Sequence, residues 1–216
     1  MSPSPAAVLA RVAGALPPVE RAYARARFLA LRPQLLGVMD ELLPTEGPLL
    51  DLGCGFGLWS AYFGAMRPGR RLHGVDLSPR RIELAGRVAA ALGVRATFAV
   101  GDARTVALGE GYVGAYMLDV LHPLPRDAQR PLLERVVAAL RPGGVLVVKE
   151  ITTEPRAGLW FTRALDRAMV GLDAPLAYRH HDEWRALLGE LGLRAEITRV
   201  RDVLPFPHVV LTSRVP

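Results

Sequence analysis

The spacing of apolar positions changes along the chain, from helical steps near the start to short runs further on. Five apolar residues recur at steps of three or four and share one face of a predicted helix: Phe28, Leu31, Leu35, Met39 and Leu42. Pro33 is expected to kink or split this helical region, because proline lacks the amide that continues a helix. Pro17 and Pro18 suit a helix start, and Pro44 with Gly47 ends the pattern.

From residue 49 onward, short apolar runs alternate with helical stretches. Strands are expected at 49–52, 72–75, 96–100, 113–118 and 145–151, and helices at 58–66, 79–92 and 131–140. This rhythm predicts parallel strands joined by helical crossovers, and therefore an α/β protein with a doubly wound sheet. Ser78 is placed to cap the helix that begins at Pro79, and Gly93 is placed to close it.

The last third of the chain has a different order of elements. Helices are expected at 156–172 and 182–191, followed by strands at 193–200 and 209–213. Only Pro205, Phe206, Pro207 and their neighbours separate these two strands, so we expect them to pair antiparallel. The length of 216 residues fits one domain, residues 1–216, with its own core.

Composition narrows the class of protein. Hydrophobic residues make up 50% and charged residues 22%, which favours a packed core over disorder. The formal net charge of +6 raises nucleic acid as a partner, but Lys149 is the one lysine and arginine is spread along the chain without a basic block. Nucleic acid is therefore not favoured. The abundance of arginine, alanine, proline and glycine is typical of a GC-rich coding genome.

Location and metal chemistry are constrained by what the chain contains. Cys54 is the single cysteine, which excludes an intramolecular disulfide and a cysteine-based metal site. No apolar run approaches the ~20 residues of a membrane span, and the apolar start is interrupted by Arg11 without preceding basic residues. We expect a cytoplasmic protein without a bound metal.

A glycine-rich turn, Leu50-Asp-Leu-Gly-Cys-Gly-Phe-Gly57, follows the first predicted strand and opens a helix. Glycine lets the backbone turn sharply and approach a ligand closely, and a helix N-terminus favours negative charge. The dinucleotide fingerprint G-x-G-x-x-G is incomplete, because Leu58 stands where its third glycine belongs.

Two acidic residues at the ends of the next strands favour a ribose-bearing ligand. Asp76 ends the second strand, 19 residues after Gly57, where a carboxylate accepts hydrogen bonds from both ribose hydroxyls. Asp102 and Ala103 follow the third strand and offer an acid and a backbone amide to an adenine edge.

These motifs together resemble those of class I S-adenosylmethionine-dependent methyltransferases, in particular the bacterial small-molecule type. The segments that carry the resemblance are Asp51-Leu-Gly-Cys-Gly-Phe-Gly57, Asp76-Leu77, Asp102-Ala103, Leu118-Asp-Val-Leu-His122-Pro-Leu-Pro and Leu140-Arg-Pro-Gly-Gly-Val-Leu-Val-Val-Lys-Glu150. The resemblance implies a Rossmann-like sheet of seven strands whose last strand is antiparallel. It also implies N-terminal helices (1–46) forming a partial lid, a cofactor-binding half (47–151) and an acceptor side (152–216).

The resemblance further implies S-adenosylmethionine as cofactor and S-adenosylhomocysteine as product. The predicted cofactor-binding residues are Asp51, Gly53, Cys54, Gly55, Gly57, Asp76, Leu77, Asp102, Ala103 and Asp119. The predicted acceptor pocket contains Tyr23, His122, Trp160, Tyr178, Arg179 and His180. For Tyr23 and Arg27, the plain surface of a helix is the preferred alternative, and for Trp160 a core position is an equal one. His180 could instead belong to the start of a helix.

His122 is the candidate catalytic residue. It follows the fourth strand, where a doubly wound sheet has its ligand crevice, so it could take a proton from the acceptor or form a pocket wall. Cys54 is expected to be a small buried residue rather than a nucleophile, since nothing in the sequence identifies a base for it.

The expected function is O- or N-methylation of a small molecule, either lipophilic or carboxylate-bearing, by a monomer or homodimer. Three alternatives remain open: a silent cofactor-binding partner protein, an RNA methyltransferase, and an NAD-dependent oxidoreductase. The Asn/Asp-Pro-Pro-aromatic motif of amino-methylating nucleic-acid enzymes is absent, because that place reads Asp119-Val-Leu-His122. Leu58 and the Asp102-Ala103 pair disfavour NAD.

Overall fold

The N-terminal region forms three helices in the computed structural model, which describes residues 3–31, 33–170, 175–200 and 206–216. They are α1 (Pro5–Gly14), α2 (Pro18–Ala30) and α3 (Pro33–Leu42). The expected split at Pro33 is confirmed, because α2 is capped at Leu31 and α3 begins at the proline. Pro18 occupies the first turn of α2, where its missing amide costs no hydrogen bond.

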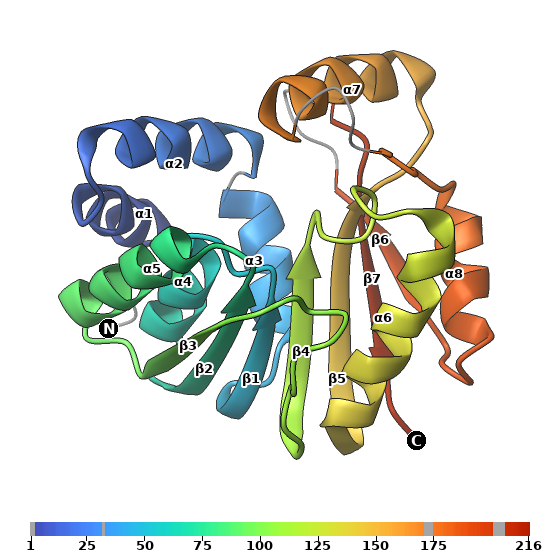
Figure 1. The fold of residues 1–216 in the computed structure, drawn as a ribbon, viewed down its shortest axis with the longest axis horizontal. Coiled ribbons are helices and arrows are strands. Elements are labelled where there is room, and N and C mark those ends of the chain that lie inside the picture. Colours follow the sequence, from blue (N-terminus) through green and yellow to red (C-terminus); the bar gives the residue numbers. More distant parts are fainter. Residues whose placement is uncertain (1–2, 32, 171–174, 201–205) are drawn as a thin grey trace.

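A seven-stranded sheet forms the centre of the molecule (Figure 1). Its strands are β1 (Glu46–Leu52), β2 (Gly69–Asp76), β3 (Ala96–Val100), β4 (Tyr112–Leu118), β5 (Leu140–Ile151), β6 (Glu196–Arg199) and β7 (His208–Arg214). The order is β3-β2-β1-β4-β5-β7-β6, with β1 to β5 parallel and β7 antiparallel to both β5 and β6. The predicted doubly wound α/β fold with an antiparallel last strand is confirmed.

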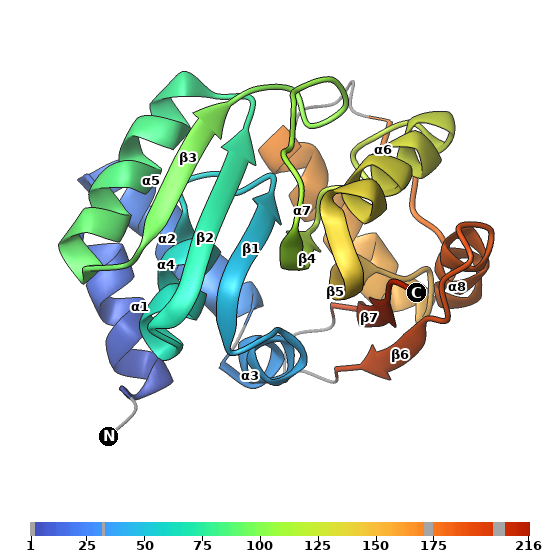
Figure 2. The same cartoon turned by 90° about the horizontal axis from the view of Figure 1, so that it is seen from below.

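Helices cover both faces of this sheet (Figure 2). The remaining helices are α4 (Leu58–Met66), α5 (Pro79–Leu92), α6 (Arg126–Ala139), α7 (Arg156–Val170) and α8 (His181–Gly189). Neighbouring residues of β4 pack into different cores: Tyr116 joins the core beneath α1 to α5, whereas Met117 joins the core beneath α6 and α8. This alternation explains why the strands read as continuous apolar runs.

Local signals explain several helix boundaries. Ser78 accepts a hydrogen bond from the Arg81 amide at 3.3 Å, and Gly93 closes α5 in the left-handed conformation, as predicted. The predicted start of α6 at residue 131 is wrong, because the helix begins at Arg126 and contains Pro131. In the part of α6 before Pro131, the side chain of Gln129 points inward, and its amide donates to backbone carbonyls.

The first of the two C-terminal strands is shorter than the pattern predicts, and the second is longer, at His208–Arg214. β6 covers Glu196–Arg199 only, and Leu193 instead bonds back to the end of α8. The expected end of a helix at Leu172 and the turn residue Pro205 lie outside the described residues. Among the described helices, none combines the length and the apolar character required to cross a membrane.

Candidate active site

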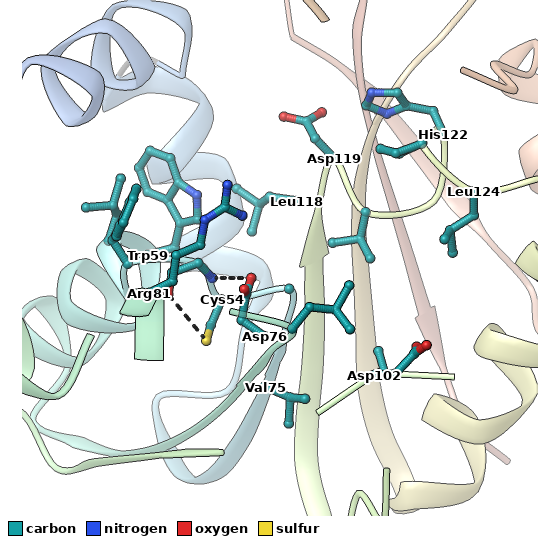
Figure 3. A pocket seen from close by; sticks show the side chains of 18 of the residues that line it. Cys54, Trp59, Val75, Asp76, Arg81, Asp102, Leu118, Asp119, His122 and Leu124 are labelled. Atoms are coloured by element: carbon teal, nitrogen blue, oxygen red, sulfur yellow. Dashed lines mark hydrogen bonds between the residues drawn. The ribbon is translucent and has the colours of Figure 1, made fainter. Parts of the chain in front are cut away.

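A cavity of about 430 Å³ lies at the carboxyl ends of the parallel strands (Figure 3). In open α/β sheets this edge is where ligands bind, at the point where the strand order reverses between β1 and β4. Asp119 and His122 lie at the end of β4, across the cavity from Trp59 and Cys54. Helices α2 and α7 lie beyond this same edge of the sheet (Figure 1).

Many predicted residues line this cavity. From the predicted cofactor set they are Gly53, Cys54, Gly55, Asp76, Leu77, Asp102, Ala103 and Asp119, and from the predicted acceptor set Tyr23 and His122. Tyr23 is therefore more than helix surface: its ring contacts that of Phe56 edge-on, with 5.6 Å between centroids. Arg27 also lines the cavity, so both residues border it in addition to lying on the helix surface.

The glycine turn forms a cradle suited to a cofactor. Gly53 has φ of +73°, and a Cβ there would lie 2.7 Å from a methyl group of Val120. Gly55 has φ of +54° and lines the cavity, with no atom within 4 Å of the position of a Cβ. Any side chain at Gly55 would occupy the space through which a ligand approaches the backbone.

Gly57 has a structural role instead, because it does not line the cavity. Its φ is +67°, and a Cβ would lie 2.8 Å from the Cβ of Ala85 and 3.0 Å from its Cα. We expect Gly57→Ala to lower the free energy of unfolding by about 1–3 kcal/mol through crowding of α5 and backbone strain. Urea unfolding measures this, with Gly86→Ala, at an uncrowded helical position, as the control. Equal stability of the two variants would contradict the packing role.

Asp76 braces the glycine turn while its carboxylate borders the cavity. Oδ2 accepts from the Gly55 amide and Oδ1 from the Ser78 amide, each at 3.0 Å. A carboxylate has about four acceptor positions, so two remain for ribose hydroxyls. Asp51, by contrast, lies outside the cavity lining and is fully buried, where it accepts from Ser60 at 2.6 Å. Burial raises the pKa of Asp51 to about 7.

The predicted adenine end of the cavity is open and charged. Leu77 is 68% exposed, an unusual position for a large apolar side chain that a flat ligand would cover. Asp102 pairs with Arg104 at 2.6 Å, and hydrogen bonds from Arg104 lower the pKa of Asp102. Ala103 lies beside them in the lining.

Asp119, at the end of β4, forms ion pairs with two cationic side chains. Oδ2 accepts from Arg27 at 2.9 Å, and Oδ1 accepts from the fully buried Lys149. Burial alone would raise the pKa of Asp119, but Lys149 and Arg27 hold it well below its usual range. Asp119 also has φ of +59°, a conformation that costs free energy in residues other than glycine and clusters at functional sites.

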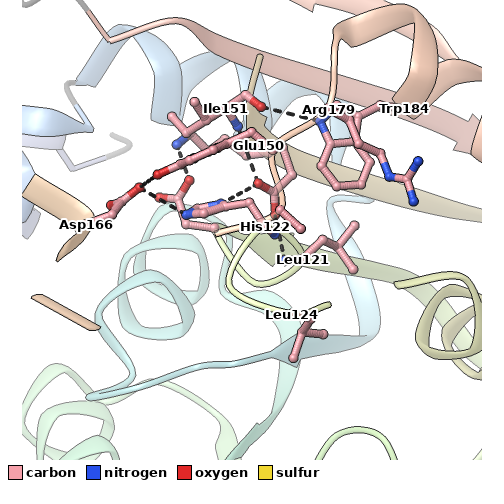
Figure 4. Close-up of polar contacts among 12 residues, drawn as sticks. Leu121, His122, Leu124, Glu150, Ile151, Asp166, Arg179 and Trp184 are labelled. Atoms are coloured by element: carbon pink, nitrogen blue, oxygen red, sulfur yellow. Dashed lines mark hydrogen bonds and ion pairs between the residues drawn. The ribbon is translucent and has the colours of Figure 1, made fainter. Parts of the chain in front are cut away.

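His122 lies between two carboxylates (Figure 4). Nδ1 is 2.6 Å from Oε2 of Glu150, Nε2 is 3.2 Å from Oδ2 of Asp166, and the ring stacks on Tyr178 at 5.0 Å. Burial alone would lower the pKa of His122, but Glu150 and Asp166 raise it to about 10.

This environment disfavours the predicted role of His122 as general base. A general base needs a free lone pair near neutral pH, whereas both ring nitrogens of His122 face carboxylates, which raise its pKa to about 10. His122 lines the cavity, which agrees with the alternative prediction of a pocket wall.

The raised pKa of His122 predicts a pH dependence of stability. A group whose pKa rises on folding, here from 6.5 to about 10, stabilises the fold fully below pH 6.5 and loses this contribution as pH rises toward 10. We expect His122→Asn to be destabilised by at least ~1 kcal/mol at pH 6.5, roughly 2–4 °C in Tm. The gap from the wild type should narrow by pH 10 in thermal unfolding series. A gap that stays constant over this range would argue against a buried imidazolium.

Four predicted pocket residues do not line the cavity. Trp160 is 77% exposed on α7, and Tyr178 lies behind His122 and donates to Asp166 at 2.6 Å. Arg179 donates to Gln129 at 2.6 Å and lies over a tryptophan ring of α8. His180 caps α8 through the Asp182 amide, as its alternative interpretation stated.

Several lining residues were not identified from the sequence, among them Phe56, Trp59, Arg81, Arg104 and Asp166. Phe56 and Trp59 adjoin the glycine turn, so their position near the motif was an available signal. Asp166 lies on α7, far from every motif, and only the packing of α7 brings it to the cavity.

Among the residues that the structure describes, two groups of side chains have metal-ligand types close together: His180, His181 and Asp182, and Asp119, His122 and Glu150. In the second group, Asp119 already binds two cations and His122 donates to Glu150. The second group is therefore an internally neutralised ion cluster rather than a cation site.

Three features lie together in a sheet of this strand order: a glycine cradle, a carboxylate at the end of β2 and another after β3. They are the features expected of the S-adenosylmethionine-binding class of Rossmann-like folds. Residues 49–144 match the family described as "Methyltransferase domain". Over these residues the chain is a methyltransferase domain of this family, whose cofactor is S-adenosylmethionine.

Curated relatives agree with this membership. A trans-aconitate 2-methyltransferase of Methylobacterium radiotolerans is 36% identical over 166 residues, 75% of this chain and 58% of that protein. A carboxy-S-adenosyl-L-methionine synthase of Campylobacter curvus is 30% identical over 115 residues, 52% of this chain and 48% of that protein. The chain thus spans about half the length of the curated relatives it matches.

Solved structures share the fold. The apo form of the methyltransferase SibL superposes with a TM-score of 0.75 at 21% identity, covering 97% of this chain and 62% of that one. The mitomycin 7-O-methyltransferase MmcR gives a TM-score of 0.73 at 24% identity, covering 90% and 56%. At these identities the likeness concerns the fold alone.

Proposed function

We propose that this protein transfers a methyl group from S-adenosylmethionine to a small-molecule acceptor. The observation that supports the proposal is a continuous cavity, which begins at Asp102 and Arg104 on the predicted adenine side. It extends to Asp119 and His122 after β4 and to Asp166 on α7. The cofactor end and the acceptor end therefore open into one space in which two molecules can be aligned.

Bound S-adenosylmethionine would supply an electrophilic methyl group to the acceptor. The residues of this chain would orient the cofactor. Asp76 and Asp102 would hold the ribose and adenine, and the glycine cradle would hold the methionine part. Alignment of two reactants supplies several kcal/mol of the barrier without any covalent intermediate. Tyr23 and Phe56 would cover the reacting centre from solvent.

Incubation with methyl-tritiated S-adenosylmethionine and a bacterial cell extract tests this proposal. We expect label in metabolites below about 1 kDa, other than S-adenosyl compounds, with the wild type and much less with Asp76→Ala at limiting cofactor. Label in the RNA fraction would favour the RNA methyltransferase alternative. Cofactor binding without any labelled product would favour the silent cofactor-binding partner. Label that stays in an S-adenosyl compound other than S-adenosylmethionine would instead indicate the reaction for which the Campylobacter curvus relative is named.

A further inference from the structure

A second cavity of about 70 Å³ adjoins the first between α2, α7 and the end of β5. Its lining comprises Tyr23, Ala26, Arg27, Leu31, Asp119, Lys149, Ile151, Leu165, Asp166, Phe206 and His208. Tyr23, Arg27, Asp119 and Asp166 line both cavities, so they form the boundary between them. The volume is several times what one water molecule requires.

The charges around the second cavity cancel. Arg27 and Lys149 both pair with Asp119, and His122 pairs with Glu150 and Asp166 behind the boundary. Three cations thus face three carboxylates. A charged ligand group entering this cavity would meet like charge as well as opposite charge, and would lose its hydration.

Asp166 offers a hydrogen-bond acceptor at the boundary. Both of its donors among the described residues, Nε2 of His122 and the hydroxyl of Tyr178, bind the same oxygen, Oδ2. Oδ1 therefore keeps its acceptor capacity. The side chain is 13% exposed and lines both cavities.

We propose that the second cavity is the acceptor subsite and takes an uncharged molecule with a short apolar part and a hydroxyl group. The hydroxyl donates to Oδ1 of Asp166, and the apolar part lies against Leu31, Ile151, Leu165 and Phe206. This inference rests on the proposed function, because it assigns the acceptor class of that same site.

Three matched probes test the charge preference: 1-butanol, butylammonium and butanoate. Each is titrated at millimolar concentration into the protein saturated with S-adenosylhomocysteine, and saturation-transfer NMR reports binding. We expect 1-butanol to bind more tightly than either ion. Tighter binding of butanoate or butylammonium, or no binding of any probe, would overturn the proposed subsite.

Two variants test the position of the subsite. Asp166→Asn should weaken the binding of 1-butanol roughly tenfold, as expected for loss of a hydrogen bond to a charged group. Leu165→Trp, at a partly exposed position of α7, should fill the cavity and abolish the signal. Asp127→Asn, the same change at an exposed position of α6, is the control and should bind like the wild type.

The outcomes separate the two proposals. If 1-butanol binds equally to the wild type and both variants, the subsite assignment is wrong while the proposed function stands. If S-adenosylhomocysteine itself does not bind the wild type, the proposed function is wrong, and the acceptor assignment with it.

Discussion

Asp76→Ala is expected to weaken S-adenosylhomocysteine binding by roughly ten- to a hundredfold, the cost of losing hydrogen bonds to an ionised carboxylate. The carboxylate lines the cavity and also accepts from the Gly55 and Ser78 amides, so its removal both deletes ligand contacts and loosens the glycine turn. Titration calorimetry measures the affinity directly.

The matched control for this prediction is Asp127→Ala, which removes an exposed carboxylate from the first turn of α6. It should bind S-adenosylhomocysteine like the wild type. Asp76→Asn keeps one acceptor oxygen and should fall between the wild type and Asp76→Ala. Unchanged affinity in Asp76→Ala would remove the ribose role from Asp76.

Lys149→Met is expected to lower the free energy of unfolding by about 3–5 kcal/mol, or roughly 10 °C in Tm. Lys149 is the one lysine of the chain and is fully buried, where it donates to Asp119. Methionine matches its length, so the cost arises mainly from leaving a half-buried carboxylate with Arg27 alone. Thermal and urea unfolding measure the loss.

A double-mutant cycle tests whether that loss is electrostatic. In Asp119→Asn/Lys149→Met both charges are absent, so the double variant should be less destabilised than the sum of the single variants. Strict additivity, or a loss below about 1 kcal/mol for Lys149→Met, would contradict the description of Asp119 and Lys149 as a coupled buried pair.

The fold was largely predictable because its signals are local. Ser78, Pro79 and Gly93 mark the ends of α5, and the alternation of apolar runs with helical stretches defines the parallel strands. The start of α6 was missed because Pro131 resembles a first-turn proline, whereas the helix already begins at Arg126.

The cofactor side of the site was predictable for the same reason, because Gly53, Gly55, Asp76 and Asp102 follow consecutive strand ends. The acceptor side was not. The charge state of His122 depends on Glu150 and on Asp166, which belong to β5 and α7 and carry no motif. Spatial neighbours set its pKa, and the sequence around His122 contains no information about them.

Calorimetric titration of the wild-type protein with S-adenosylhomocysteine and, in parallel, with NAD tests whether the cavity at the ends of β1 to β4 is an S-adenosyl site. We expect saturable binding of S-adenosylhomocysteine at one site per chain and no binding of NAD. Binding of NAD, or no binding of S-adenosylhomocysteine at millimolar concentration, would contradict this assignment.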